Sequence, residues 1–148
     1  MSSPEELSFQ VTPMVRDRCL CLHLQRAARA IARRFDAAFR PFDLTNGQFS
    51  LLMSLHRPEP ASIASVSHVM AMDRTTLTAA LKPLERRELV TVAVDEADRR
   101  SRRLSLTPAG RALLAAALPT WLETHATVDA LLGDSNLDRL RADLRALS

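Results

Sequence analysis

The sequence predicts a mostly helical protein with one small β-hairpin, and its composition supports this fold class. Hydrophobic residues make up 47% of the 148 residues, which is enough to form a core, while glycine occurs only three times. Aromatic residues make up 4%, which argues against an aromatic-rich β-sandwich. Most stretches repeat apolar residues at steps of three and four, as amphipathic helices do, and two short stretches alternate as strands do. A chain of this length is expected to form one domain with an extension.

The N-terminal region predicts a flexible arm followed by a long helix. Residues 1–14 are polar and interrupted by proline, so we expect the arm there. Over about 16–40, Leu24, Ile31 and Phe35 belong to an apolar stripe at helical spacing. One small domain cannot bury a stripe of this length. We therefore expect this helix to pair with its copy in a second subunit.

Three short helices are predicted next, each with a residue suited to begin it. Thr45 and Gln48 have the spacing of a capping box. Ser62 and Asp73 are the expected N-caps of the following two helices. Two short helices in tandem, the second beginning at Asp73, have the order of a helix-turn-helix.

The helix that begins at Asp73 has two contrasting faces. Leucines at positions 77, 81 and 84 recur at steps of four and three, so they are expected to face the core. The opposite face carries Arg74, Thr75, Thr78, Ala79 and Lys82. Hydroxyl groups can bond phosphates or base edges, methyl groups can touch thymine, and a helix N-terminus attracts phosphate. This face is therefore suited to close docking in a DNA groove.

A hairpin with an arginine-rich tip follows. Residues 90–94 and 103–106 alternate apolar and polar side chains as half-buried strands do, and DEADRRSRR joins them. The tip contains Arg99, Arg100, Arg102 and Arg103. These charges would repel one another unless they are paired or bound to an anion, and we expect Asp98 to hold one through charge-assisted hydrogen bonds. Because narrow minor grooves attract arginine, the two helices and this hairpin predict a winged helix-turn-helix.

The C-terminal third predicts two more helices. Thr107 and Pro108 read as the N-cap and first residue of a long helix. Pro119 lies inside it and is expected to kink or locally break it. Gly133 should end this region, and Asp134 or Ser135 should cap a last helix. That last helix has an apolar stripe of Leu137, Leu140, Leu144 and Leu147.

The charge distribution favours a phosphate-binding face. Nineteen of the 20 basic residues are arginine, and the formal net charge is +3. Between Arg74 and Arg111 there are nine basic residues against five acidic ones. Such clustering is typical of nucleic-acid binding, although ordinary surface charge in an arginine-rich chain is the alternative. No apolar run has the length of a membrane span, and the N-terminus lacks the features of a secretory signal. We therefore expect a cytoplasmic protein, in which the two cysteines stay reduced.

Two stretches resemble the MarR family of bacterial transcriptional regulators. They are DRTTLTAALKPLERRELV and DEADRRSRRLSLTPAG, the second of which matches the family's D-x-R followed by L-T-x-x-G. The resemblance covers roughly residues 16–148. It implies one MarR-type domain over 15–148, with a winged-helix core at about 45–107. The helices at about 16–40 and 108–147 would then join two copies into a homodimer.

The resemblance also implies a function and a set of contacts. The homodimer would bind a near-palindromic operator, with recognition helices in successive major grooves, and would act as a ligand-responsive repressor. Asp98 would orient Arg100, which would enter the minor groove. The implied DNA-binding residues are Ser62, Arg74, Thr75, Thr76, Thr78, Ala79, Lys82, Asp98, Arg99, Arg100 and Arg102. Many family members release DNA when a small, often phenolic or acidic, molecule binds between the two lobes. No cofactor is implied.

Two positions depart from the family's pattern. Ala79 and Ala80 stand where the family often has long hydrogen-bond donors, which puts base readout there in doubt. Glu88 replaces a glycine that is common after the recognition helix. A glutamate in a left-handed C-cap would cost up to about 1 kcal/mol, so we expect this turn to be built differently.

Cys21 carries an alternative hypothesis of thiol-based peroxide sensing. It lies 24 residues before Thr45, where the organic-hydroperoxide-sensing branch of the family has its reactive cysteine. A helix N-terminus with Arg18 in reach would favour the thiolate. That branch uses tyrosines to bond the cysteine, whereas this chain has none and places Gln25 and Phe35 there. The other interpretation is a small buried hydrophobic side chain.

Metal binding and catalysis find no support in the residue spacing. Cys19 and Cys21 would point about 200° apart on one helix, so they cannot share an ion within it. The four histidines show no metal-ligand spacing. A glycine-rich phosphate loop and a G-x-S-x-G motif are absent, so we expect no enzyme. A winged helix that binds protein instead of DNA is the remaining class, and the arginine-rich tip argues against it.

Overall fold

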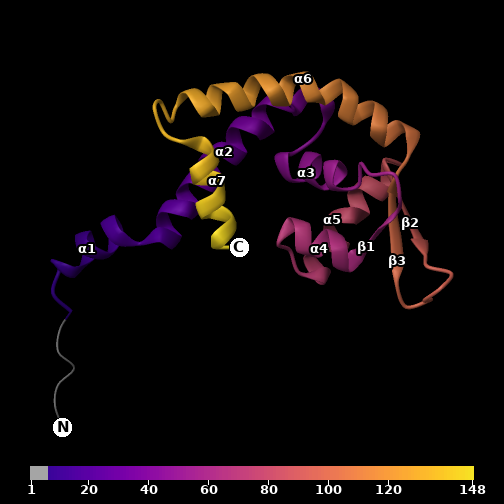
Figure 1. Cartoon of the computed structure of the whole chain (residues 1–148), viewed down its shortest axis with the longest axis horizontal. Coiled ribbons are helices and arrows are strands. Elements are labelled where there is room, and N and C mark those ends of the chain that lie inside the picture. The colour runs from indigo at the N-terminus through magenta and orange to yellow at the C-terminus, as the bar shows by residue number, and fades with distance from the viewer. Residues whose placement is uncertain (1–6) are drawn as a thin grey trace, which may run out of the picture. The chain divides into compact units, whose positions relative to one another are not determined.

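The computed structural model describes residues 7–148 and divides the chain into two compact units, Met1–Arg34 and Phe35–Ser148. Figure 1 labels the α-helices and strands, which are numbered in chain order. The elements are α1 (Val11–Arg18), α2 (Leu20–Ala38), the 3-10 helix η1 (Arg40–Phe42), α3 (Asn46–Ser54), β1 (Ala61–Ser62), α4 (Ile63–Met70), α5 (Arg74–Arg86), β2 (Val90–Val94), β3 (Arg102–Leu106), α6 (Pro108–Ala130) and α7 (Leu137–Ala146). The predicted class, helices with a small β-wing, is confirmed. None of the helices within residues 7–148 is long and apolar enough to cross a membrane.

The first unit contains α1 and most of α2, two helices where the sequence predicted one. Cys19 adopts an extended backbone with φ −70° and ψ 103°, which separates α1 from α2. Of the arm expected over 1–14, residues 1–6 lie outside the described part of the chain, and Val11–Met14 are helical. Leu20 and Leu24 on α2 are exposed. This is expected of an apolar stripe that has no partner within this chain.

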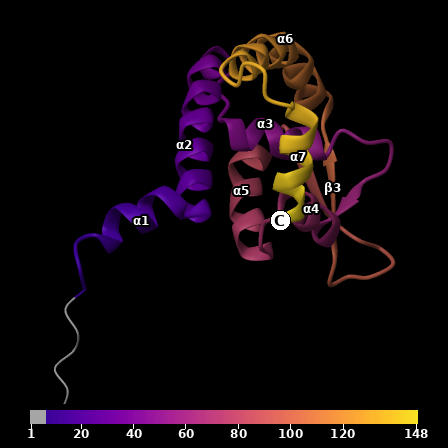
Figure 2. The same cartoon turned by 60° about the vertical axis from the view of Figure 1, so that its left-hand side comes forward.

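The second unit is built around a three-stranded antiparallel sheet and the helices packed on it. The strand order is β1-β3-β2, with Ala61 and Val92 both opposite Leu104. The largest fully buried side chains are Phe39, Leu51, Leu52, Val66, Leu77, Leu84 and Leu104. Leu77 and Leu84 of α5 are among them, so the predicted inward face of this helix is confirmed. The β2–β3 hairpin extends away from the packed helices of the second unit (Figure 2).

The predicted helix starts are confirmed by their hydrogen bonds. Thr45 accepts a bond from the Gln48 backbone N–H while the Gln48 side chain accepts one from Thr45, which completes the capping box. Ser62, Asp73 and Thr107 each cap their helix through the side chain. The last helix is a correction, because Asn136, and neither Asp134 nor Ser135, caps α7 by accepting from the Arg139 N–H. The amide of Asn136 serves there in the same way as a carboxylate would.

The turn after α5 corrects the expectation for Glu88. This residue does adopt the left-handed conformation, with φ 57°. Two bonds typical of a helix end form around it, from Glu88 N to Glu85 O and from Leu89 N to Leu84 O. The Thr107 hydroxyl donates to the Glu88 carbonyl at 2.6 Å, and this bond helps hold the strained turn.

The start of α6 is fastened to the same turn. The Thr107 N–H donates to the Leu89 carbonyl at 3.1 Å. Gly110 lies so close that a Cβ there would collide with that carbonyl oxygen. The glycine of the L-T-x-x-G motif is therefore required for packing. The turn after α5 and the start of α6 are held together at this point, which we call the joint between α5 and α6.

The two C-terminal helices differ in how they are packed. The α6 helix continues through Pro119 without interruption, so the expected local break is wrong. It buries Leu114, Ala117 and Val128 against the core. The α7 helix buries no residue, and Leu140 and Leu144 on its apolar stripe are 37% and 40% exposed.

Candidate nucleic-acid interface

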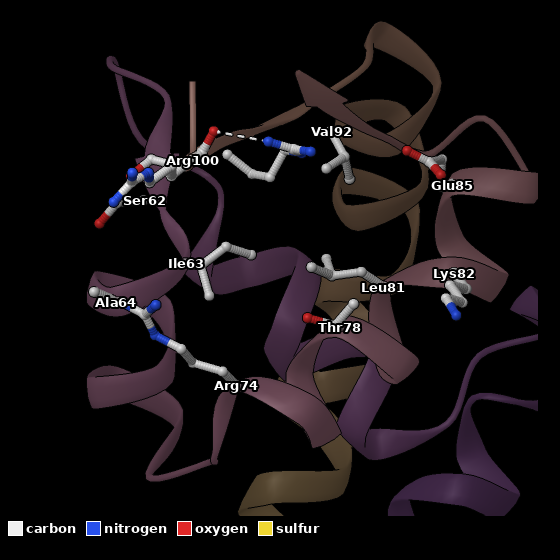
Figure 3. Close-up of a pocket in the computed structure, with 12 residues that line it drawn as sticks. Ser62, Ile63, Ala64, Arg74, Thr78, Leu81, Lys82, Glu85, Val92 and Arg100 are labelled. Atoms are coloured by element: carbon white, nitrogen blue, oxygen red, sulfur yellow. Dashed lines mark hydrogen bonds between the residues drawn. The ribbon is translucent and has the colours of Figure 1, made fainter. Parts of the chain in front are cut away.

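A hollow of about 420 Å³ lies between α5, the start of α4 and the hairpin. It brings together six of the predicted DNA-binding residues, namely Ser62, Arg74, Thr78, Lys82, Arg100 and Arg102. Figure 3 shows how residues of the three elements surround one space. The remaining lining residues are Ile63, Ala64, Leu81, Glu85, Val92 and Ser101.

The α5 helix sets the spacing of the lining side chains. Arg74, Thr78, Lys82 and Glu85 follow one another at steps of four, four and three, so they form one stripe along the helix. Asp73 begins the helix by accepting from the Thr76 backbone N–H at 2.8 Å. This bond lowers the pKa of the Asp73 carboxyl below its ordinary value.

Three predicted residues of α5 lie outside the hollow. Thr75, Thr76 and Ala79 are exposed on α5 but do not line it. The Thr76 hydroxyl donates to Asp73 at 2.9 Å, so it takes part in the cap. The sequence placed these residues on the outer face but could not show which part of that face the wing encloses.

The start of α4 forms a second side of the hollow. Ser62 pairs with Arg103 in the sheet and caps α4 by accepting from the Ser65 N–H at 3.1 Å. Its neighbours Ile63 and Ala64 also line the hollow, although no sequence motif marked them. They lie there because the two-residue strand β1, which is too short for a periodicity to reveal, pairs with β3.

The hairpin tip is organised by Asp98 in an unexpected way. Its carboxylate accepts from the Arg100 backbone N–H and the Ser101 hydroxyl, each at 3.1 Å. The expectation that Asp98 holds a guanidinium is therefore wrong for this structure. Asp98 shapes the backbone of the tip instead, and Arg100 extends from that backbone.

The ion pair of the hairpin lies elsewhere. Asp95 accepts from the Arg103 guanidinium at 3.0 Å. The Ala97 N–H and then the Arg103 charge lower the pKa of the Asp95 carboxyl. Arg102 donates to the carbonyls of Arg99 and Ser101, which fixes its side chain against the tip.

Most cations of the interface have no acidic partner. Among residues 7–148, Arg74, Lys82, Arg99 and Arg100 form no ion pair within 4.0 Å. The single carboxylate that lines the hollow is Glu85. An excess of unpaired cations around a concave surface attracts a polyanion.

A second hollow, of about 670 Å³, has the opposite character. It lies between α3, α4 and α6 within the second unit, and its lining residues are Phe49, Ser50, Met53, Ser54, Val69, Met70, Leu118 and Trp121. None of these side chains is ionisable at neutral pH. The sequence could not reveal this hollow because its walls come from segments far apart along the chain.

The cysteines and histidines form no metal centre in the described residues. Cys19 and Cys21 are unpaired thiols, and no group of three potential ligands occurs within residues 7–148. Cys21 is exposed, and its sulfur accepts from the Gln25 amide at 3.2 Å. The interpretation of Cys21 as a buried hydrophobic residue is therefore wrong for the chain by itself. The His125 Nδ1 atom lies 3.3 Å from a carboxylate oxygen of Asp129, and the ring packs on Trp121.

Comparison with protein families and curated relatives identifies the winged region. The model of the MarR family matches residues 44–101, which run from the start of α3 to the hairpin tip. The HTH-type transcriptional regulator SarZ of Staphylococcus aureus is 29% identical over 94 residues. The match covers 64% of this chain and 64% of SarZ, so less than two thirds of that relative is spanned.

Two solved structures are similar over most of their length. The M. tuberculosis transcriptional regulator MosR in complex with DNA is 38% identical with a TM-score of 0.79, and the match covers 88% of this chain and 93% of MosR. The transcriptional repressor CouR, bound to a 23-mer DNA duplex, is 30% identical with a TM-score of 0.79. That match covers 97% of this chain and 99% of CouR.

Proposed function

Because the chain belongs to the MarR family of DNA-binding transcriptional regulators, and is therefore not an enzyme, we propose that it acts as a homodimeric repressor on a near-palindromic operator. The observation that carries this proposal is the convergence of Arg74, Lys82 and Arg100, all without an acidic partner, on one hollow. A bacterial regulator that binds DNA works in the cytoplasm, and we propose this location for the protein.

The two sides of the hollow have different tasks on DNA. The α5 helix enters the major groove, where Thr78 reaches base edges or phosphates and Arg74 and Lys82 contact the backbone. The hairpin carries Arg100 into the neighbouring minor groove, whose negative potential is strongest where it is narrow. In a homodimer, two such units read half-sites about one DNA turn apart.

The homodimer is supported by apolar helix faces that lack a partner in this chain. The α7 helix buries no residue although Leu140, Leu144 and Leu147 form a stripe on it. On α2, Leu20, which is 67% exposed, belongs to a similar stripe. A soluble monomer rarely leaves apolar stripes of this size open, whereas a second copy would cover them.

The experiment that tests DNA binding is a salt titration of operator affinity. Arg100→Ala should weaken binding at least about 10-fold and should reduce the log–log salt slope by about 1.8, because each of the two copies loses one cation from the DNA surface. Arg139→Ala on α7 removes an arginine away from the hollow and should leave both values unchanged. Unchanged affinity in Arg100→Ala would show that the wing has another role. No affinity for duplex DNA even at low salt would favour the protein-binding alternative.

Control by a small molecule is part of the same proposal. The apolar hollow between α3, α4 and α6 has a volume in the range of small-molecule sites and is lined mostly by hydrophobic and aromatic side chains. An effector that binds there, with the phenolic compounds of the family as first candidates, would release the operator. Mobility-shift assays with and without such compounds test this step.

Thiol-based sensing through Cys21 is a second candidate, favoured by one contact. The Gln25 amide donates to the Cys21 sulfur, and the thiol is exposed, so an oxidant from solvent can reach it. Peroxide should then weaken operator binding in the wild type but not in Cys21→Ser. Cys19→Ser is the matched control two residues away. A Cys21→Ser protein that responds like the wild type would remove this candidate.

A further inference from the structure

We propose that the apolar hollow between α3, α4 and α6 selects an uncharged, flat molecule, and that α4 transmits its binding to the DNA-facing hollow. This inference rests on the proposed function as a ligand-responsive DNA-binding protein. It adds the chemistry of the ligand and the element that carries the response.

The lining residues exclude a buried charge. Within the second unit, the only polar side chains around this hollow are Ser50 and Ser54, and the Ser54 hydroxyl already donates to the Leu51 carbonyl at 2.7 Å. A carboxylate buried here would find no cation and would lose its hydration, which is strongly unfavourable. A neutral hydroxyl or amide can instead donate to the serine oxygens. The ligand that fits is therefore uncharged in the part that enters the hollow.

The aromatic walls favour a flat ring. Trp121 and Phe49 lie nearly parallel, with an interplanar angle of 14° and centroids 6.3 Å apart. Trp121 also packs on His125, with centroids 4.7 Å apart, so its ring is supported from the side. Met53 and Met70 are flexible and polarisable, and they can adjust to the edge of an aromatic ligand.

The α4 helix is the one helix that borders both hollows. Val69 and Met70 at its C-terminal end line the apolar hollow, while Ile63 and Ala64 at its N-terminal end line the DNA-facing hollow. The eight residues of α4 form a rod about 12 Å long. A displacement of one end of α4 therefore moves the other end as well.

The ends of α4 are held so that the helix moves as one body. Ser62 caps its start, and Ala71 ends it in the left-handed conformation with φ 49°. The Met72 N–H donates to the Ser67 carbonyl at 2.9 Å, so the turn that leads to Asp73 and α5 is fixed to α4. A ligand that pushes on Val69 therefore shifts both the Ser62 side of the DNA-facing hollow and the start of α5.

The ligand chemistry is tested with matched pairs of flat probes. Trp121 is the only tryptophan of the chain, so its fluorescence reports binding in the hollow. The probes are 2-naphthamide and 2-naphthoate, cinnamamide and cinnamate, and benzamide and benzoate. The neutral member of at least one pair should bind tenfold or more tightly than its anion and should lower operator affinity. Equal or tighter binding of the anions, or no binding by any probe, overturns the ligand assignment.

The role of α4 is tested without a ligand. Val69, which is 61% exposed, tolerates a larger side chain, and Val69→Phe should partly fill the hollow and lower operator affinity at least fivefold. His68→Phe is the matched control, because His68 is exposed on the same helix but does not line the hollow. Unchanged affinity in Val69→Phe overturns the coupling through α4.

The outcomes separate this inference from the proposed function. A wild-type protein that fails to bind duplex DNA contradicts the proposed function itself. A protein that binds its operator and the neutral probes, but whose operator affinity responds to neither the probes nor Val69→Phe, contradicts only the coupling. If Val69→Phe changes the oligomeric state in sedimentation and no probe binds, the hollow is covered by a second copy, and the ligand assignment is wrong.

Discussion

The winged core and the α7 helix differ in what covers their apolar side chains. Residues from Phe35 to Val128 bury their apolar side chains against one another, and Phe39, Leu52 and Leu104 are fully enclosed. The α7 helix has an equally regular apolar stripe but encloses none of it. The same periodicity therefore has two uses in this chain. In the core it stabilises the fold of one copy, and in α7 it is available to join two copies.

The largest effect is expected where the core is tightest. Gly110→Ala places a Cβ against the Leu89 carbonyl, so the start of α6 must move, and we expect a loss of about 3 kcal/mol in the free energy of unfolding. Gly47→Ala is the matched control, since its Cβ would meet nothing closer than 4.0 Å and would favour the helix. Denaturant unfolding measures both variants. Equal stability of the two would show that the joint between α5 and α6 is loose.

A charge on the α7 stripe should separate the copies without unfolding the core. Leu144→Glu, with Leu140→Glu if one change is not enough, should convert a dimer into a monomer that keeps its helical circular dichroism. Ala142→Glu places the same side chain on the opposite face of α7 and should leave the dimer intact. Sedimentation velocity measures the oligomeric state. A Leu144→Glu, Leu140→Glu protein that remains dimeric would remove α7 from the interface.

A smaller gain is expected at the strained turn of the core. Glu88→Gly should raise the free energy of unfolding by up to about 1 kcal/mol, because glycine adopts φ 57° at little cost. Glu88→Ala keeps the strain while it removes the charge, so it should bring no such gain. If alanine stabilises as much as glycine, the cost at this position is electrostatic.

The smallest effect is a dependence of core stability on acid. The pKa of Asp73 is lower in the folded protein than its ordinary value of 3.8, because the Thr76 N–H favours the carboxylate. This contribution is complete above that ordinary value and is lost as the pH falls through the lowered one. Asp73→Asn keeps a capping side chain but cannot titrate, so its stability should fall less between about pH 5 and pH 2. A parallel decline in both proteins would contradict this assignment.

The sequence predicted the parts of this fold that depend on neighbouring residues. The caps at Thr45, Ser62, Asp73 and Thr107 were predictable because each bonds a backbone group three residues away. Strand β1 was not predicted, because two residues carry no periodicity and their pairing with β3 is a tertiary contact.

The candidate site was predictable only in its composition. Arg74, Lys82 and Arg100 were found from helical spacing and from the motif of the hairpin. The contribution of Ile63 and Ala64 depends on how the hairpin folds over α4 and α5. The turn that Asp98 builds is local, but the sequence did not distinguish a bond to the Arg100 backbone from a bond to a guanidinium. The apolar hollow was missed because residues 49–54, 69–70 and 118–121 meet only in the folded chain.

The joint between α5 and α6 has a mechanical consequence. The 23 residues of α6 form an arm about 35 Å long that is anchored at Thr107 and Gly110 to the end of the groove-binding helix. Because Leu114, Ala117 and Val128 also hold α6 against the core, the helix acts as a rigid lever, and a sideways displacement of about 3 Å at its far end corresponds to a rotation of only about 5° at the anchor. In the proposed homodimer on DNA, a small error in how the two copies meet would therefore change the angle of α5 only slightly.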